Sequence, residues 1–209
     1  MAMDKFKKVV GISLLGSFLL VGCSSEEEVE PKIKDEPTEV EEVEEEEEEV
    51  KDESSVGKRS NPVPLGETVE FPVTANDDDG NSFDGVGSMV FNDVVRGEEA
   101  FNQLMEMNQF NEEAPEGYEW AIINTKFTLD ELETEDESFY VWFTFNSYGA
   151  DGSESPTEPY GTVDNEFGFV DLYSGGSNEG LEAILVPKGD DDVKVKVSDW
   201  GTEIFFEIQ

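Results

Sequence analysis

The sequence predicts an all-β fold, a β-sandwich with one short inserted helix, preceded by a signal peptide and a disordered acidic linker. Three observations support this prediction. Stretches after residue 57 alternate polar and apolar side chains with period two, as half-buried strands do. Clusters of Gly, Asn, Asp and Ser separate these stretches as turns. One segment alone has helical spacing, and seven or eight short strands with one small helix favour two packed sheets.

The expected strands run from Glu67 to the C-terminal end. In ETVEFPVTA (67–75), Val69, Phe71 and Val73 share one face, and Pro72 favours a sheet edge because it has no N–H to donate. The other expected strands are GSMVFNDVV (87–95), YEWAIINTKFTL (118–129), FYVWFTFN (139–146), LEAILVP (181–187), VKVKV (193–197) and EIFFEI (203–208).

Two of these stretches allow finer predictions. FYVWFTFN is apolar on both faces, so we expect a central strand that is covered on both sides. In VKVKV we expect the three valines to point inward and Lys194 and Lys196 to point outward.

The segment with helical spacing is RGEEAFNQLMEMNQFN, residues 96–111. Ala100, Phe101, Leu104 and Met105 recur at helical intervals, and the acidic pair before them suits a helix N-terminus. We therefore expect a short helix inserted between two strands.

Residues 1–22 have the pattern of a lipoprotein signal peptide. Three lysines precede an uncharged run of 14 residues, Val9 to Gly22. As a helix this run would span about 21 Å, which is shorter than the roughly 30 Å hydrocarbon core of a bilayer. It therefore suits a signal sequence better than a permanent membrane span.

Leu20-Val21-Gly22-Cys23 resembles the lipobox of bacterial lipoprotein precursors. The resemblance implies that the sulfur of Cys23 receives a diacylglyceryl group, with fatty acids such as palmitate, and that the chain is cut before it. Two acyl chains give lasting attachment, so we expect a protein anchored by lipid to the extracellular face of the cell membrane. The alternative is a weak uncleaved anchor in which Cys23 is incidental.

Residues 23–56 are low in complexity and rich in glutamate, with EEVEEEEEEV at 41–50. Such a segment cannot bury enough apolar surface to offset its chain entropy, so we expect a disordered tether. Its main role would be that of a spacer, and weak binding of divalent cations is the alternative. The folded domain is then expected at residues 57–209.

Composition excludes several functions. The formal charge is −39, from 52 acidic and 13 basic residues, which disfavours a nucleic-acid partner. The chain has no histidine and one cysteine, which excludes a Ser-His-Asp triad, imidazole ligands and thiolate zinc clusters. We expect no catalytic residue, no cofactor and no resident metal.

Three motifs resemble the telokin-like, immunoglobulin-like domain of unknown function found in lipoproteins of Gram-positive bacteria. They are RSNPVPLGETVEF (59–71), VVRGEEAFNQLMEMNQFNEEAPEGYEWAIINTKF (94–127) and ILVPKGDDD (184–192). The resemblance implies an immunoglobulin-like β-sandwich outside the membrane and supplies no catalytic residue. Residues 161–173 depart from the pattern, so the strand course there is less defined.

Three sets of candidate site residues follow. The first set is two acidic loops, NDDDGNSFDG (76–85) and KGDDD (188–192). When the first loop is aligned from Asp77 to the EF-hand calcium loop, Ser82 and Ser88 stand where that loop needs Gly and Glu, so the sequence does not match an EF-hand. Trp120, Trp142 and Trp200 could stack on carbohydrate, but core positions are favoured.

Arg96, one of seven basic residues in the folded part, is interpreted either as part of a recognition site near the helix or, preferentially, as a clamp on carbonyl or carboxylate groups.

The favoured function is a non-catalytic extracellular module that binds a protein or another envelope ligand. The alternatives are an acidic surface protein that protects the envelope through hydration and weak cation binding and, last, a carboxylate hydrolase.

Overall fold

The computed structural model describes residues 56–199 and 201–209, all within one compact unit, Glu48–Gln209. The predicted signal peptide, Cys23, most of the tether and Trp200 lie outside the described residues. The predictions made for them therefore stay predictions.

The described residues form nine strands and one helix, in the order strand, strand, helix and then seven strands. Their bounds are β1 (Thr68–Asn76), β2 (Ser82–Arg96), α1 (Gly97–Met107), β3 (Tyr118–Leu132), β4 (Phe139–Val141), β5 (Thr144–Tyr148), β6 (Val170–Leu172), β7 (Ser177–Pro187), β8 (Lys194–Ser198) and β9 (Glu203–Glu207).

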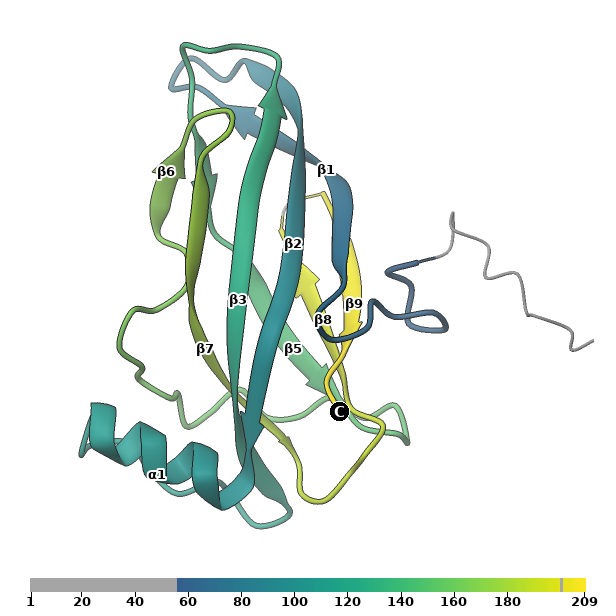
Figure 1. The fold of residues 1–209 in the computed structure, drawn as a ribbon, viewed down its shortest axis with the longest axis vertical. Helices are drawn as coiled ribbons and strands as arrows, with labels where there is room; N and C mark the ends of the chain where they lie inside the picture. Colours follow the sequence, from purple (N-terminus) through teal and green to yellow (C-terminus); the bar gives the residue numbers. More distant parts are fainter. Residues whose placement is uncertain (1–55, 200) are drawn as a thin grey trace, which may run out of the picture. The chain divides into compact units, whose positions relative to one another are not determined.

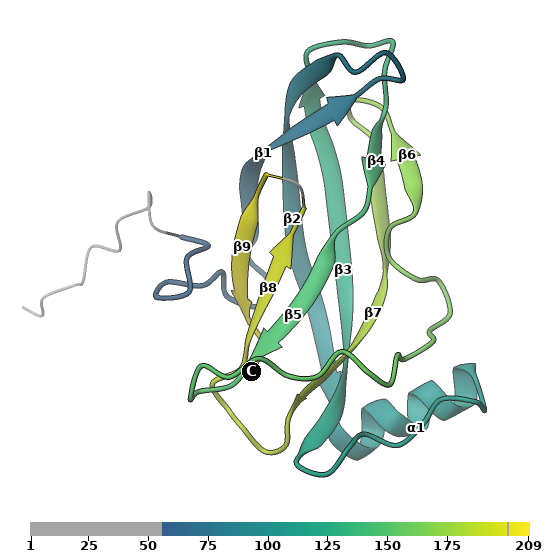
Figure 2. The same ribbon diagram turned by 180° about the vertical axis from the view of Figure 1, so that it is seen from behind.

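The strands form antiparallel sheets that pack face to face. The large sheet has the order β1-β2-β3-β7, and a second sheet has the order β5-β8-β9. A short ribbon pairs β4 with β6. Figures 1 and 2 show β5, β8 and β9 as a layer over the long strands of the large sheet. This arrangement confirms the predicted fold class, an all-β sandwich with one short inserted helix.

The main core fills the space between the two layers. Phe91 of β2 stacks on Phe206 of β9 with ring centroids 4.1 Å apart, so the large sheet and the three-stranded sheet meet directly. The valines of VKVKV point into this core, as predicted, and their burial removes apolar surface from water. Val69, Phe71 and Val73 of β1 face the same core, and β1 is an edge strand, as Pro72 indicated.

The helix packs on the other face of the large sheet and confirms the predicted insertion. Ala100 and Leu104, one helical turn apart, are buried against Trp120, Ile122 and Leu185. The alternation along β3 therefore serves two cores, one under the helix and one inside the sandwich. Figure 2 shows α1 at one end of the large sheet and the paired strands β4 and β6 toward the other end.

The prediction of one central strand at 139–146 was wrong. The chain leaves the β4–β6 ribbon after Val141 and joins the three-stranded sheet at Thr144, where β5 is an edge strand. Only one face is covered: Phe139 and Val141 are buried, whereas Tyr140 and Trp142 are 52% and 44% exposed. The large aromatic side chains of Tyr140 and Trp142 are therefore not explained by packing in the core.

Candidate functional site

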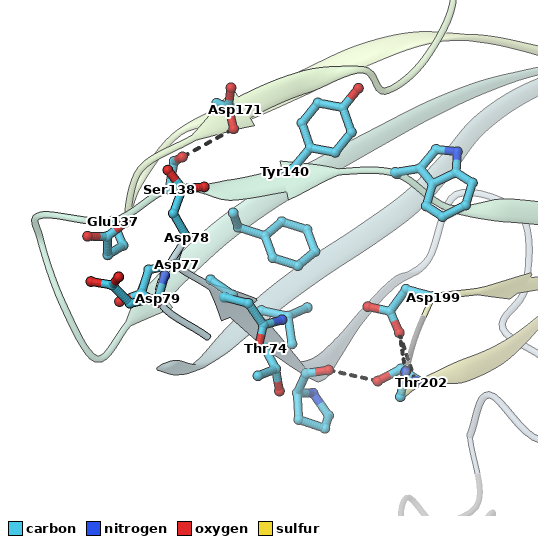
Figure 3. Close-up of a pocket in the computed structure, with 17 residues that line it drawn as sticks. Thr74, Asp77, Asp78, Asp79, Glu137, Ser138, Tyr140, Asp171, Asp199 and Thr202 are labelled. Carbon is cyan, nitrogen blue, oxygen red and sulfur yellow. Dashed lines mark hydrogen bonds between the residues drawn. The ribbon is translucent and has the colours of Figure 1, made fainter. Parts of the chain in front are cut away.

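A cleft of about 820 Å³ opens beside the β4–β6 ribbon (Figure 3). It is lined by four parts of the chain that are distant in sequence: residues 72–79, residues 137–140 with Trp142, Asp171, and residues 199–202 without the undescribed Trp200. The end of β1, the strand β4, the strand β6 and the turn between β8 and β9 therefore meet around one opening. We call it the acidic cleft.

Six of the 17 described residues that line the cleft carry carboxylates. They are contributed by all four parts of the chain, at Asp77, Asp78, Asp79, Glu137, Asp171 and Asp199. Among the described residues that line the cleft, none is Lys or Arg. The potential in the cleft is thus strongly negative, and it favours cations and donor groups over anions.

Two of these carboxylates also hold their own turns. Asp77 accepts hydrogen bonds from the Asn81 side-chain amide at 2.6 Å and from the N–H groups of Asn81 and Asp79. These donors, the Asn81 side chain first, keep the pKa of Asp77 below its usual value. Asp199 accepts from the N–H groups of Gly201 and Thr202, so both turns present the cleft in a defined shape.

The walls on either side of the opening are tied to the sandwich. The Thr202 hydroxyl donates to the carbonyl of Pro72 at 2.8 Å, which joins the β8–β9 turn to the free edge of β1. The Ser138 hydroxyl donates to Asp171 at 3.1 Å, which joins the start of β4 to β6. These hydrogen bonds hold the walls of the cleft in place in the ligand-free protein, so the cleft is preorganised for binding.

Three aromatic residues of the described chain line the cleft, Phe139, Tyr140 and Trp142, and the two exposed ones, Tyr140 and Trp142, come from the segment whose position was mispredicted. Tyr140 and Trp142 lie two residues apart and share the solvent-facing side of the chain at β4. Exposed aromatic rings next to carboxylates are typical of binding surfaces, because rings supply contact area and the carboxylates supply hydrogen-bond acceptors.

The three predicted tryptophan positions have different outcomes. Trp120 is 1% exposed, as expected for the core, and its indole N–H donates to the carbonyl of Glu112 at 2.9 Å. The core prediction for Trp142 was wrong, because the chain switches sheets there and turns the ring outward. Trp200 lies outside the described residues.

Both acidic loops contain an aspartate that accepts hydrogen bonds from backbone N–H groups, within its own turn at Asp77 and from its own turn and a neighbouring loop at Asp190. Asp190, in the second loop, accepts from the N–H groups of Ala150 and Asp192, which lower its pKa. In the described part of the chain, no three Asp, Glu or Cys side chains are grouped as a metal ion would require. The first loop nevertheless contributes Asp77, Asp78 and Asp79 to the acidic cleft.

Arg96 acts as a clamp. Its guanidinium donates to the carbonyls of Asp190 at 2.9 Å and Pro187 at 3.3 Å and pairs with Glu119 at 3.0 Å. It therefore ties the end of β2 to β3 and to the β7–β8 loop, which is the preferred of the two predicted roles.

Sequence reasoning missed Asp171 and Ser138 as site residues. Asp171 lies in the stretch 161–173, where the strand course was left open, and a three-residue strand carries too little alternation to be recognised. The period-two spacing of Tyr140 and Trp142 was visible, but it does not show which side of a strand is covered.

Comparison with known proteins finds matches to two solved structures. One is MPT63, a secreted protein of Mycobacterium tuberculosis, at 13% identity and a TM-score of 0.44, covering 71% of this chain and 99% of that one. The other is the ycdA protein of Bacillus subtilis, named a "putative lipoprotein", at 13% identity and a TM-score of 0.39. The match covers 59% of this chain and 36% of that protein. No family model and no curated protein sequence matches.

The described residues also bear on membrane insertion. Between residues 56 and 209, leaving out Trp200, no helix combines the length and the apolar character that crossing a bilayer requires.

Proposed function

We propose that this chain is a lipid-anchored extracellular lipoprotein of the telokin-like family, and that its sandwich is a non-catalytic binding module whose ligand site is the acidic cleft. In this proposal Cys23 carries the lipid, residues 24–56 form a spacer, and the domain from residue 57 faces away from the cell membrane. The ligand is a component of the envelope or of the surroundings of the cell.

The lipid anchor is supported by residues 1–23. Lysines are followed by an apolar run that ends at the lipobox cysteine. This run is shorter than a typical transmembrane helix, as expected for a signal peptide. The glutamate-rich segment that follows repels itself and the anionic membrane surface, which favours an extended tether.

The observation that carries the binding function is the composition of the acidic cleft. Two exposed aromatic rings and six carboxylates converge on one opening whose walls are fixed by hydrogen bonds. A surface that served only to carry charge and hydration would not need to gather apolar rings at the same place. A binding module is therefore favoured over a purely protective acidic surface.

Crosslinking in intact cells tests the binding function. A photo-crosslinking amino acid replaces Tyr140 in the cleft and, in a control variant, Glu99 on the exposed side of α1. We expect light-dependent adducts of the full chain from position 140 and not from position 99. Equal adducts from both positions, or none from position 140, would contradict the assignment of the cleft.

Mass spectrometry tests the anchor. We expect the native protein to begin at Cys23 with acyl groups on it, and Cys23→Ser to release the protein from the membrane fraction. An unmodified sulfur with Met1 to Gly22 still attached would overturn this part of the proposal.

A further inference from the structure

The aromatic surface extends beyond the acidic cleft. Next to Tyr140 and Trp142, the two residues that flank β6 are also exposed aromatics, Phe169 at 55% and Tyr173 at 56%. We call these four residues the aromatic ribbon. Four large aromatic side chains exposed on and directly beside one pair of short strands exceed the scattered exposure that is normal for a soluble surface.

The register of the two strands brings these residues together. Tyr140 of β4 pairs with Asp171 of β6, so Phe169 and Tyr173 lie two residues to either side of its partner. The N–H of Phe169 donates to the carbonyl of Val141 at 2.8 Å, which keeps the two chains adjacent beside Trp142. Asp171, whose carboxylate accepts from Ser138, stands in the middle of the aromatic ribbon.

The backbone at Phe169 is held in an unfavourable conformation. Its φ is +58°, in the left-handed region that bulky residues rarely occupy, and it follows Gly168 at +92°. A buried apolar ring could offset such strain by packing, but this ring is more than half exposed. Strained residues of this kind concentrate at binding surfaces.

The hydrogen-bonding groups beside the aromatic ribbon define the ligand's chemistry. Acidic side chains accept hydrogen bonds and cannot donate when ionised, so the six carboxylates call for a ligand rich in donors. Each hydroxyl of a sugar can donate a hydrogen bond to a carboxylate, and the apolar C–H face of the sugar ring packs on an aromatic side chain, so a sugar matches both halves of this surface.

Charge narrows the class of sugar. The domain from residue 57 has 34 acidic and 7 basic residues, a net charge of 7 − 34 = −27. A polysaccharide with uronic acid, sulfate or phosphate groups would be repelled. An ammonium group on the sugar would be attracted to the carboxylates and to the faces of the exposed rings.

We propose that the aromatic ribbon and the adjoining acidic cleft bind a glycan chain without acidic groups, and bind it most tightly when its sugars carry free amino groups. This inference rests on the proposed binding function and names the ligand class of the same site. The rings stack on the sugar faces, and Asp171 and its neighbours in the cleft accept from hydroxyl and ammonium groups.

Calorimetric titration of the full chain carrying Cys23→Ser tests the inference. The probes are oligosaccharides of glucosamine, of N-acetylglucosamine and of galacturonate, together with oligolysine as the peptide alternative. We expect binding in that order of strength for the three sugars, with no measurable binding of the galacturonate chain. Tyr140→Ala and Trp142→Ala should each weaken glucosamine binding about tenfold, by loss of ring stacking.

Matched controls separate the site from the general acidity of the protein. Tyr160→Ala and Phe110→Ala remove exposed rings elsewhere, and Glu98→Gln with Glu99→Gln removes charge on α1; none should change glucosamine binding. Equal affinity of all variants, or no sugar binding, would overturn the inference. So would oligolysine binding that is at least as tight and is lost in the same two ring variants.

The two proposals can fail separately. Adducts from position 140 in cells, with no binding of any glycan probe, would overturn the ligand class and leave the binding function in place. Absence of both adducts and glycan binding would overturn both.

Discussion

The guanidinium of Arg96 at the end of β2 lies 3.0 Å from the carboxylate of Glu119 in β3, and both side chains are only 18% exposed. The same guanidinium donates to the carbonyl of Pro187, the last residue of β7, and to that of Asp190 in the β7–β8 loop. One side chain thus joins three parts of the sandwich beside the first turn of α1. A planar fork with several donors is needed for this, which lysine lacks.

Arg96→Met should lower the free energy of unfolding by about 2–3 kcal/mol, because it leaves a half-buried Glu119 and two carbonyls without their donor. Arg96→Lys should recover only part of this loss. Urea denaturation measures both effects. The control is Lys196→Met. The partner of Lys196 is Glu203, which lies 3.4 Å away and is 65% exposed, so this substitution should lower the free energy of unfolding by less than about 1 kcal/mol. A loss at Arg96 no larger than the control would refute the clamp.

Thr125→Val should stabilise the protein by about 1 kcal/mol. The hydroxyl of Thr125 is fully buried in the sandwich and has no hydrogen-bond partner among the described residues, so a methyl group of similar size removes a desolvated polar group. Ser147→Ala is the opposite control, because the Ser147 hydroxyl is paired with the carbonyl of Leu185 at 2.6 Å and with Ser155 at 2.7 Å. Thermal and urea unfolding should show opposite signs; a loss of stability for Thr125→Val would contradict the account.

Glu182 should make stability fall as the pH rises toward neutrality. Burial of its carboxyl, with the charge of Glu166 nearby, raises the pKa of Glu182 from 4.5 to about 7. Because the folded protein binds this proton more tightly than the unfolded chain, the contribution is complete below about pH 4.5 and is lost as the pH rises through about 7.

Glu182→Gln should therefore flatten the pH dependence of unfolding between pH 5 and pH 8 relative to the unchanged protein. Urea unfolding across this range measures the difference, with the exposed Glu179→Gln on the same strand as a control. Parallel curves for Glu182→Gln and the unchanged protein would show that the carboxyl does not titrate differently on folding.

Gly180→Ala should cost at least about 2 kcal/mol, because an added Cβ would meet the carbonyl oxygen of Asn165 at 2.6 Å and the backbone of Phe167 at 2.7 Å. Backbone atoms cannot move aside as a flexible side chain can. Gly201→Ala, where no atom of the described residues beyond its chain neighbours lies within 4 Å of the added Cβ, should change stability by less than about 1 kcal/mol. Similar melting temperatures for the two variants would contradict this close approach of β7 to residues 165–167.

Added salt should raise the melting temperature. A net charge of −39 opposes compaction, and the Debye length falls from about 10 Å at 0.1 M to about 3 Å at 1 M salt. Differential scanning calorimetry in sodium chloride measures the shift. No increase would mean that the repulsion between carboxylates contributes little to the folded state.

The sequence predicted elements whose patterns are long and regular. The period-two pattern of β1, the valines of β8 and the helical spacing of Ala100 and Leu104 all match the structure, because local geometry dictates which side chains share a face. The short ribbon was not predicted. A strand of three residues such as β6 carries almost no periodicity, and its pairing with β4 joins segments about 30 residues apart.

By itself, the sequence determined the β-sandwich class, the inserted helix, the edge position of β1 and the acidity of the surface, because periodicity, turn residues and charge are local or additive properties. Tertiary structure alone decided that the chain changes sheets between Val141 and Thr144, and that Tyr140 and Trp142 therefore face solvent beside Asp171 and Asp199. Alternation along a strand shows which residues share a side. Only the packing of other strands shows which side is covered.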